Sequence, residues 1–72
     1  MDDLKEQFGK RVRVLRVQKQ MTQEQLAEAT NISVDFLSLI ERGRNAPSFG
    51  IIERLAHTLG VPVKELFDFN NE

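Results

Sequence analysis

Residues 21–43, MTQEQLAEATNISVDFLSLIERG, contain the pattern that indicates the fold most clearly. Thr22-Gln-Glu-Gln25 is a capping box, because the Thr22 hydroxyl can accept from the backbone N–H of Gln25 and the Gln25 side chain can reach back. Asn31 suits a left-handed turn. Ser33 then suits the N-cap of the next helix. Gly43, the last residue of the stretch, suits the end of that helix. Two short helices joined by a three- or four-residue turn form a helix-turn-helix, here over residues 22–43.

Helical periodicity is also present before this stretch. A first helix is predicted from about Asp3 to Lys19, and the pattern Asp3-x-x-Glu6 can form an acidic capping arrangement at its start. The apolar residues that recur at helical spacing along it are Phe8, Val12 and Leu15. They predict a helix with one buried face.

Two further helices are expected after the stretch. Ser48 caps the fourth helix, and Pro62 suits the first position of a short fifth helix that runs through Phe67. The apolar stripe of the fourth helix is Ile52, Leu55, Ala56 and Leu59. With no strand pattern, internal repeat or linker, residues 1–72 are predicted to be one all-α domain of five helices, with its core in residues 6–67.

Length and composition exclude several classes of protein. The chain has 72 residues and no cysteine, so we expect no disulfide bonds and no thiolate metal site. No apolar run approaches the roughly 20 residues of a transmembrane helix, and the acidic N-terminus is unlike a signal peptide. These features predict a soluble, cytoplasmic protein with no membrane partner.

The sequence also has no pattern typical of a metal site, a catalytic triad or a phosphate-binding loop. The single histidine, His57, lies off the apolar stripe and cannot make a structural zinc site alone. Neither a nucleophilic triad nor a Gly-rich phosphate loop is present. We therefore expect no metal, no cofactor and no enzymatic activity.

The net charge is −1, but the charges are unevenly distributed. Residues 1–20 carry six Lys and Arg against three acidic residues, and residues 41–60 carry three Arg against two Glu. Residues 21–40 and 61–72 hold the excess acid. Because a nucleic-acid ligand needs a local positive face rather than a positive total, the charge does not exclude DNA binding.

The chain resembles the lambda-repressor-like (Cro/repressor, XRE) family of small helix-turn-helix DNA-binding transcriptional regulators. The matching stretches, which together lie within roughly residues 6–67, are Phe8-Gly-Lys-Arg-Val-Arg-Val-Leu-Arg16, Met21-Thr-Gln-Glu-Gln-Leu-Ala27, Leu37-Ser-Leu-Ile-Glu-Arg-Gly43, Pro47-Ser48 and Leu55 through Phe67. The resemblance implies a five-helix domain that binds operator DNA as a homodimer. Relatives of this size include phage repressors, restriction–modification controllers and antitoxins.

The resemblance also implies an ion pair between Arg16, on the first helix, and Glu41, near the end of the third. Gln20 and Asn31 stand where the family often has Gly, and each is expected to adopt the same left-handed turn. Two valines of the first helix, Val14 and Val17, stand where relatives usually have polar residues. They are a contact for RNA polymerase, a contact for a second dimer, or ordinary exposed valines.

In the family the third helix lies in the major groove, which is about 12 Å wide and admits one helix. The side of this helix opposite the core residues Phe36, Leu37 and Ile40 carries Leu39, which we expect to be fully exposed. The predicted base-reading residues are Val34, Asp35, Ser38 and Leu39. Alternatively, this side is merely solvated, and Asp35 serves only the helix dipole.

Phosphate contacts are predicted where helix ends and cations coincide. Backbone N–H groups and the dipole favour a phosphate at a helix N-terminus, and arginines add charge-assisted hydrogen bonds. The predicted phosphate-binding residues are Gln23, Ser33, Arg42, Arg44 and Asn45. Lys10, Arg11 and Arg13 either steer DNA or are simply solvated.

A homodimer is expected because one recognition helix reads few bases, whereas two half-sites about 34 Å apart double the readout. The predicted dimer interface is the C-terminal end of the chain, at Val63, Leu66, Phe67 and Phe69. The alternative is that Leu66 and Phe67 simply close the core.

Two functions therefore compete. The first is a sequence-specific regulator that binds double-stranded DNA as a homodimer on a two-fold operator, of the phage-repressor or restriction–modification-controller type. The second is a protein-interaction module that kept the fold but reads no sequence. The acidic net charge and Asp35 favour the second, while Arg42, Arg44 and the capped turn favour the first.

Overall fold

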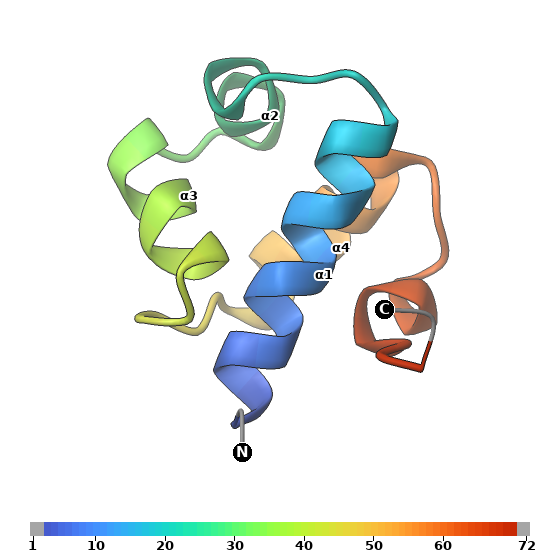
Figure 1. The fold of residues 1–72 in the computed structure, drawn as a ribbon. Coiled ribbons are helices and arrows are strands. Elements are labelled where there is room, and N and C mark those ends of the chain that lie inside the picture. Colours follow the sequence, from blue (N-terminus) through green and yellow to red (C-terminus); the bar gives the residue numbers. More distant parts are fainter. Residues whose placement is uncertain (1–2, 71–72) are drawn as a thin grey trace.

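A computed structural model describes residues 3–70 as four α-helices and one 3₁₀ helix, with no strand in that range (Figure 1). The elements in chain order are α1 (Leu4–Gln18), α2 (Gln23–Thr30), α3 (Val34–Glu41), α4 (Phe49–Leu59) and η1 (Val63–Phe67). The all-α prediction is confirmed, but the count of five α-helices is not. Five residues after Pro62, with no side-chain cap, form the tighter 3₁₀ turn that is usual for short segments.

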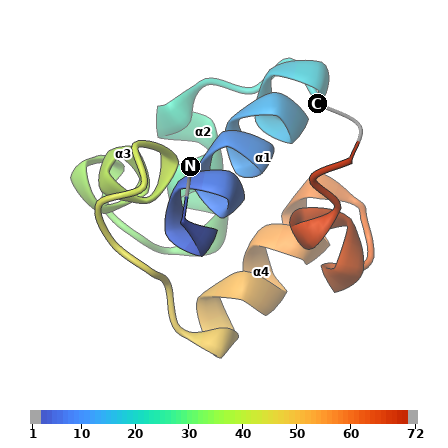
Figure 2. The same ribbon diagram turned by 60° about the horizontal axis from the view of Figure 1, so that its bottom comes forward.

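Helix α1 lies at the centre of the arrangement. Figure 1 and Figure 2 show α3 on one side of it and η1 on the other, and α2 packs against α3 and α4. The apolar core contains Phe8, Val12, Leu15, Leu26, Ala27, Leu37, Ile40, Ile52, Leu55, Ala56, Leu59 and Leu66. The predicted apolar stripes of the first and fourth helices therefore both face the core.

Each α-helix begins at the polar residue that the sequence predicts. Asp3 with Glu6, and Thr22 with Gln25, form reciprocal capping boxes, with backbone-to-side-chain distances of 2.9–3.1 Å. The Ser33 hydroxyl accepts from the backbone N–H of Phe36 at 2.9 Å. The hydroxyl of Ser48 caps α4 in the same way, at 3.3 Å from the backbone nitrogen of Ile51. Such caps typically contribute about 1 kcal/mol each.

Both predicted left-handed turns are present. Gln20 has φ 61° and Asn31 has φ 60°, and these are the two non-glycine residues with positive φ in the described part of the chain. The backbone N–H of Ile32, just after the second turn, donates to the carbonyl of Ala27 at 3.0 Å, which closes α2. The turn thus sets the direction in which α3 leaves α2.

Helices α1 and α3 approach so closely that their backbones touch at Gly9. A Cβ atom at this position would collide with the carbonyl oxygens of Ile40 and Glu41, at the last turn of α3. Because these are backbone atoms, a side chain at position 9 could be accommodated only by moving α3. Gly9 therefore fixes the distance between the two helices.

The structure corrects the prediction for Arg11, which was expected to steer DNA or to be solvated. The side chain is buried, with the residue 6% exposed. Its Nε donates to the carbonyl of Glu65 at 2.8 Å, and its Nη2 donates to the Glu65 carboxylate at 2.9 Å. Arg11 lies one turn from both Phe8 and Leu15, so the helical period itself directs it toward η1.

Candidate nucleic-acid interface

The outward side of α3 is less exposed than the sequence predicts. Asp35 and Arg42 are exposed, and Ser38 is half-buried. Leu39 is also half-buried, so the expectation that it is fully exposed is wrong. Leu39 lies in the last turn of α3, where the loop folds back: its carbonyl accepts from the backbone N–H of Arg44 at 2.9 Å.

Val34 differs more from its predicted role. It is partly buried and packs against the apolar core. Its position at the first turn of α3, directly after the Ser33 cap, directs it toward the side of α3 that faces the core. Asp35 and Ser38 are therefore the predicted base-reading residues with polar atoms on the outward side.

The pair implied by the family resemblance, Arg16 and Glu41, is present at the centre of the helix-turn-helix. The Nε of Arg16 donates to one carboxylate oxygen of Glu41 at 2.7 Å, and its Nη2 donates to the other at 3.1 Å. The third nitrogen of the guanidinium donates to the carbonyl of Met21 at 2.9 Å. A bidentate pair of this kind fixes orientation as well as charge. It joins α1 to α3 and to the start of α2.

Gln23 enters this network, which the sequence did not reveal. Its side-chain Nε2 donates to the Glu41 carboxylate at 3.0 Å. Glu41 therefore orients Gln23 at the first turn of α2 while leaving the second hydrogen of that amide for another acceptor. Gln23 and Glu41 are 18 residues apart, and no local pattern relates them.

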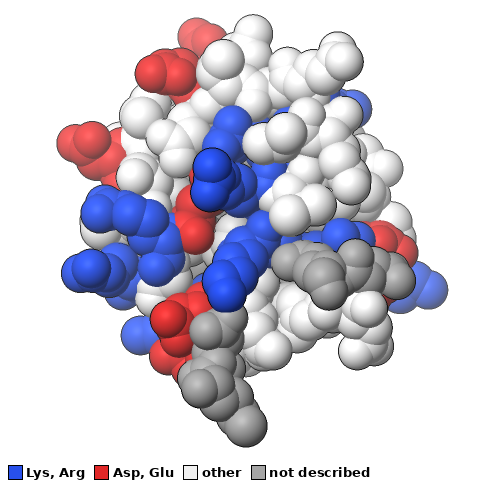
Figure 3. All heavy atoms as spheres, viewed as in Figure 1, with Lys and Arg blue, Asp and Glu red and all other residues white. Residues whose placement is uncertain are grey.

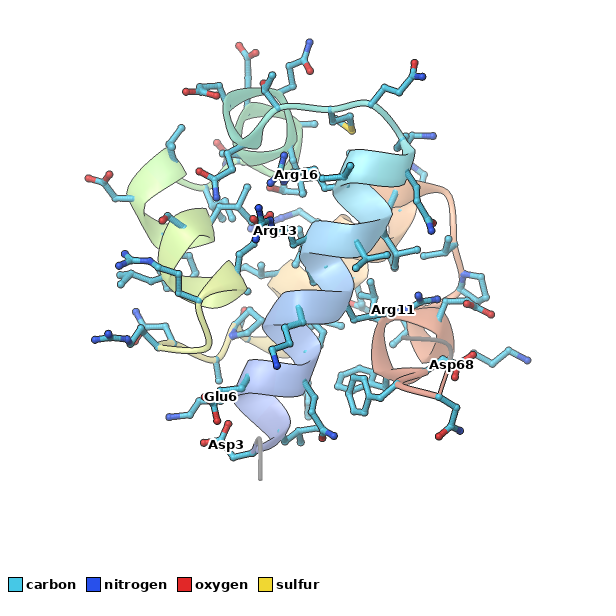
Figure 4. All side chains as sticks on the ribbon, in the orientation of Figure 1. Asp3, Glu6, Arg11, Arg13, Arg16 and Asp68 are labelled. Carbon is cyan, nitrogen blue, oxygen red and sulfur yellow. The ribbon has the colours of Figure 1, made fainter. Side chains whose placement is uncertain are left out.

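An open cleft of about 510 Å³ lies between α1, α2 and α3 beside this network. The exposed Arg13 lines it from α1 and the exposed Arg42 from the end of α3, together with the Thr22 and Ser38 side chains. Figure 4 shows Arg13 and Arg16 on the side of α1 that faces α3. The cleft beside the start of α2 is thus lined by polar and charged side chains of both signs, since Glu24 and Glu41 also belong to its lining.

Cations gather on this same face of the molecule. Figure 3, in the orientation of Figure 1, shows Lys and Arg side chains over α1 and beside the end of α3. Arg44 and Asn45 are exposed in the loop after α3, and the Arg42 side chain donates to the carbonyl of Ser38 at 3.3 Å. Ser33 is exposed at the start of α3. Of the predicted phosphate-binding residues, the half-buried Gln23 and the exposed Arg42 line the cleft, whereas Ser33, Arg44 and Asn45 are exposed but are not part of its lining.

The predicted dimer residues separate into two groups. Leu66 is 0% exposed and belongs to the core, so its assignment to an interface is wrong. Val63 and Phe67 keep about two-fifths of their surface exposed. Phe67 packs against Phe8 with ring centroids 5.1 Å apart, and the ring of Phe69 meets Phe67 edge-on at 6.3 Å. The alternative that this segment closes the core holds for Leu66 and partly for Phe67.

The described residues offer little for other chemistry. Within residues 3–70, no three His, Asp or Glu side chains are grouped so that they could hold a metal ion. His57 is exposed on α4. No helix in this range is long and apolar enough to span a membrane.

The helix-turn-helix domain family matches residues 7–68, nearly all of the described chain. The chain belongs to the helix-turn-helix family of transcriptional regulators. The immunity repressor of Bacillus phage phi105 is 40% identical over 58 residues, which cover 81% of this chain and 40% of that repressor. Control protein C.BamHI of Bacillus amyloliquefaciens is 41% identical over 63 residues, which cover 86% of this chain and 78% of that protein.

A solved structure supports the same assignment. The clp gene regulator ClgR from Corynebacterium glutamicum has a TM-score of 0.91 at 34% identity, covering 94% of this chain and 72% of that one. This chain thus spans less than half of the phage repressor but most of the control protein and of ClgR. The three similar proteins are a repressor, a control protein and a gene regulator.

Proposed function

We propose that this helix-turn-helix regulator binds double-stranded DNA in a sequence-specific manner, as a homodimer on a two-fold operator. The observation that carries the proposal is the outward side of α3, where Asp35 and Ser38 present polar atoms next to exposed arginines on the helix-turn-helix face. The major groove of B-DNA is wide enough to admit one α-helix, so the outward side of α3 can approach the base edges. The similarity to a phage repressor and to a control protein supports a regulator of either type.

The phosphate backbone is held around the cleft in this proposal. Arg13 and Arg42 supply charge from two sides, and Gln23 supplies an amide hydrogen at the start of α2. Phosphate contacts set register and make binding salt-dependent, but they carry no sequence information. Base reading therefore depends on α3.

Selection of bound fragments from a random DNA pool tests the proposal directly. Two-fold symmetric sites with half-sites about one helical turn apart are the expected result. Retention of no fragments at physiological salt would instead favour the protein-interaction module, and retention of all fragments without an enriched motif would contradict sequence-specific reading. The same selection reports the operator that each variant prefers.

Asp35 separates readout from helix stabilisation. In the proposal its carboxylate accepts from a cytosine amino group, so Asp35→Ala loses preference at one cytosine per half-site, worth about 1–3 kcal/mol. Non-specific affinity stays equal or rises, because a negative charge near the phosphates is removed. A variant that melts earlier but selects an unchanged motif would show that Asp35 only favours the positive end of the α3 dipole.

A further inference from the structure

One end of the molecule carries an apolar hollow that the DNA-facing site does not use. It has a volume of about 220 Å³ and lies between the start of α1, the loop before α4, the start of α4 and η1. The side chains that form it include Leu4, Phe8, Pro47, Phe49, Ile52 and Phe67. We call this surface the Phe49 patch. Lys5 is the one charged residue in its lining.

Phe49 is the most exposed large hydrophobic side chain in the described part of the chain, at 86%. It occupies the first position of α4, directly after the Ser48 cap, where the core side of the helix has not yet begun. Leu4, across the hollow, is 60% exposed. Scattered apolar residues are ordinary on surfaces, whereas a contiguous group around a hollow indicates a binding surface.

We propose that the Phe49 patch is where a second copy of this chain docks, with the Phe49 ring of each copy covering the hollow of the other. The inference rests on the homodimer of the proposed function and names the surface that forms it. The patch includes Phe67 and so is continuous with the part of the predicted C-terminal interface that is still exposed.

Shape favours a second copy over a small ligand. The hollow is below the roughly 300–1,000 Å³ of sites that hold drug-sized molecules, and its lining contains almost no polar group to orient one. A two-fold interface requires that one patch be complementary to itself. The Phe49 patch meets this condition because it contains both a projecting ring and an apolar depression.

The exposed apolar area of the Phe49 patch also supports a second copy of this chain as its partner. A Phe side chain buries about 150–250 Å², so Phe49 and the exposed parts of Leu4 and Phe67 together offer an apolar surface of about 300 Å². A stable interface buries about 800 Å² on each partner, of which the apolar centre is only part. The patch thus has the size of an interface centre for a small, reversible dimer.

The position of the patch is compatible with DNA binding. Figure 2 looks toward the end at which α1 begins and shows α3 on one side of α1 and η1 on the other. A copy docked between the start of α4 and η1 therefore leaves the outward side of α3 uncovered.

The test compares two exposed apolar residues in the full chain. Phe49→Ser should raise the dissociation constant of the dimer by about 100-fold or more, because each dimer loses two buried rings. Sedimentation equilibrium measures this constant. The matched control is Val17→Ser, since Val17 is also exposed, at 56%, but lies near the other end of α1. The control should dimerise like wild type, and circular dichroism should show that both variants keep their helices.

Cross-linking gives a second measurement that does not depend on affinity. Because the chain has no cysteine, a single Leu4→Cys should form a disulfide-linked dimer on mild oxidation, while Val17→Cys should dimerise without forming that disulfide. A folded Phe49→Ser protein that dimerises like wild type would overturn this interface and leave the two-fold operator intact. A wild-type chain that remains monomeric both alone and on its selected DNA would overturn the homodimer itself.

Discussion

Helix α1 carries the buried Arg11 and the half-buried Arg16, each paired with a glutamate on a different part of the molecule. Arg16 binds Glu41 of α3, and Arg11 binds Glu65 of η1. The Glu41 side chain is 3% exposed, whereas the Glu65 side chain is 35% exposed. Both carboxylates receive a charged hydrogen bond, but only the first is removed from water.

The two glutamates differ in how many hydrogen bonds are lost with the side chain. The Glu41 carboxylate accepts twice from Arg16 and once from Gln23, so removing it takes away three hydrogen bonds at a site with little exposure. The Glu65 carboxylate accepts from Nη2 of Arg11 at a site open to water. Each arginine keeps one backbone carbonyl as a partner, that of Met21 for Arg16 and that of Glu65 for Arg11. The loss of Glu41 should therefore cost more than the loss of Glu65.

The largest effect is expected for Glu41→Ala. Breaking one partner of a buried pair costs about 3–5 kcal/mol, because the other charge is stranded. For a domain of this size, each kcal/mol lowers Tm by about 4–8 °C, so thermal melting should shift down by at least about 12 °C. The double variant Arg16→Met/Glu41→Leu is the control, since apolar replacement of both partners is often neutral. Equal melting of Glu41→Ala and wild type would show that the pair contributes nothing.

A smaller loss is expected for Glu65→Ala, about 1 kcal/mol, because water screens the half-exposed carboxylate and the carbonyl bond to Arg11 remains. Thermal melting should fall by a few degrees, with operator affinity unchanged. If this variant lost as much stability as Glu41→Ala, the proposed contrast between the two arginines would be wrong.

The two left-handed turns that flank α2 allow a gain instead of a loss. Gln20→Gly should raise the free energy of unfolding by about 0.5 kcal/mol, because relief of the left-handed strain exceeds the added entropy of the unfolded chain. Asn31→Gly should be nearly neutral, because Asn tolerates this conformation better. Urea denaturation of the two variants measures the difference, and a Gln20→Gly protein less stable than wild type would contradict it.

The smallest effect is expected for substitutions of Val14 and Val17 on α1, which take part in neither the ion pair with α3 nor the ion pair with η1. Val17 is exposed and Val14 is half-buried beside Lys10 and Arg13. Val14→Lys/Val17→Lys should change stability by less than about 1 kcal/mol and leave operator affinity intact. A reporter assay completes the test. Full DNA binding with lost regulation would identify these valines as a contact for RNA polymerase.

Local features of the fold could be predicted from the sequence because their causes are local. The Asp3 and Thr22 caps each act over three residues, and the left-handed turn at Asn31 depends on one. Helical spacing likewise identified the apolar stripes, since burial follows the period. The Arg16–Glu41 pair came from the family resemblance rather than from spacing.

The features that were missed depend on contacts between distant parts of the chain. Arg11 and Glu65 are 54 residues apart, so α1 alone could not show which atoms would receive the guanidinium. The link from Gln23 to Glu41 and the partial burial of Val34 depend on how α3 crosses its neighbours. No local pattern in the sequence distinguishes Phe49, because the hollow beside it is formed by four separate segments of the chain.

The contact at Gly9 has a consequence for how such a regulator can change its DNA target. The depth and tilt of α3 are set by backbone atoms at Gly9 and by its inward residues, Leu37, Ile40 and Glu41. None of these faces the duplex in the proposed complex. The outward residues Asp35 and Ser38 can therefore be exchanged without moving the helix that carries them. The preference for a DNA sequence can therefore change by substitution on the outward side of α3, while the inward side continues to supply the packing that stabilises the fold.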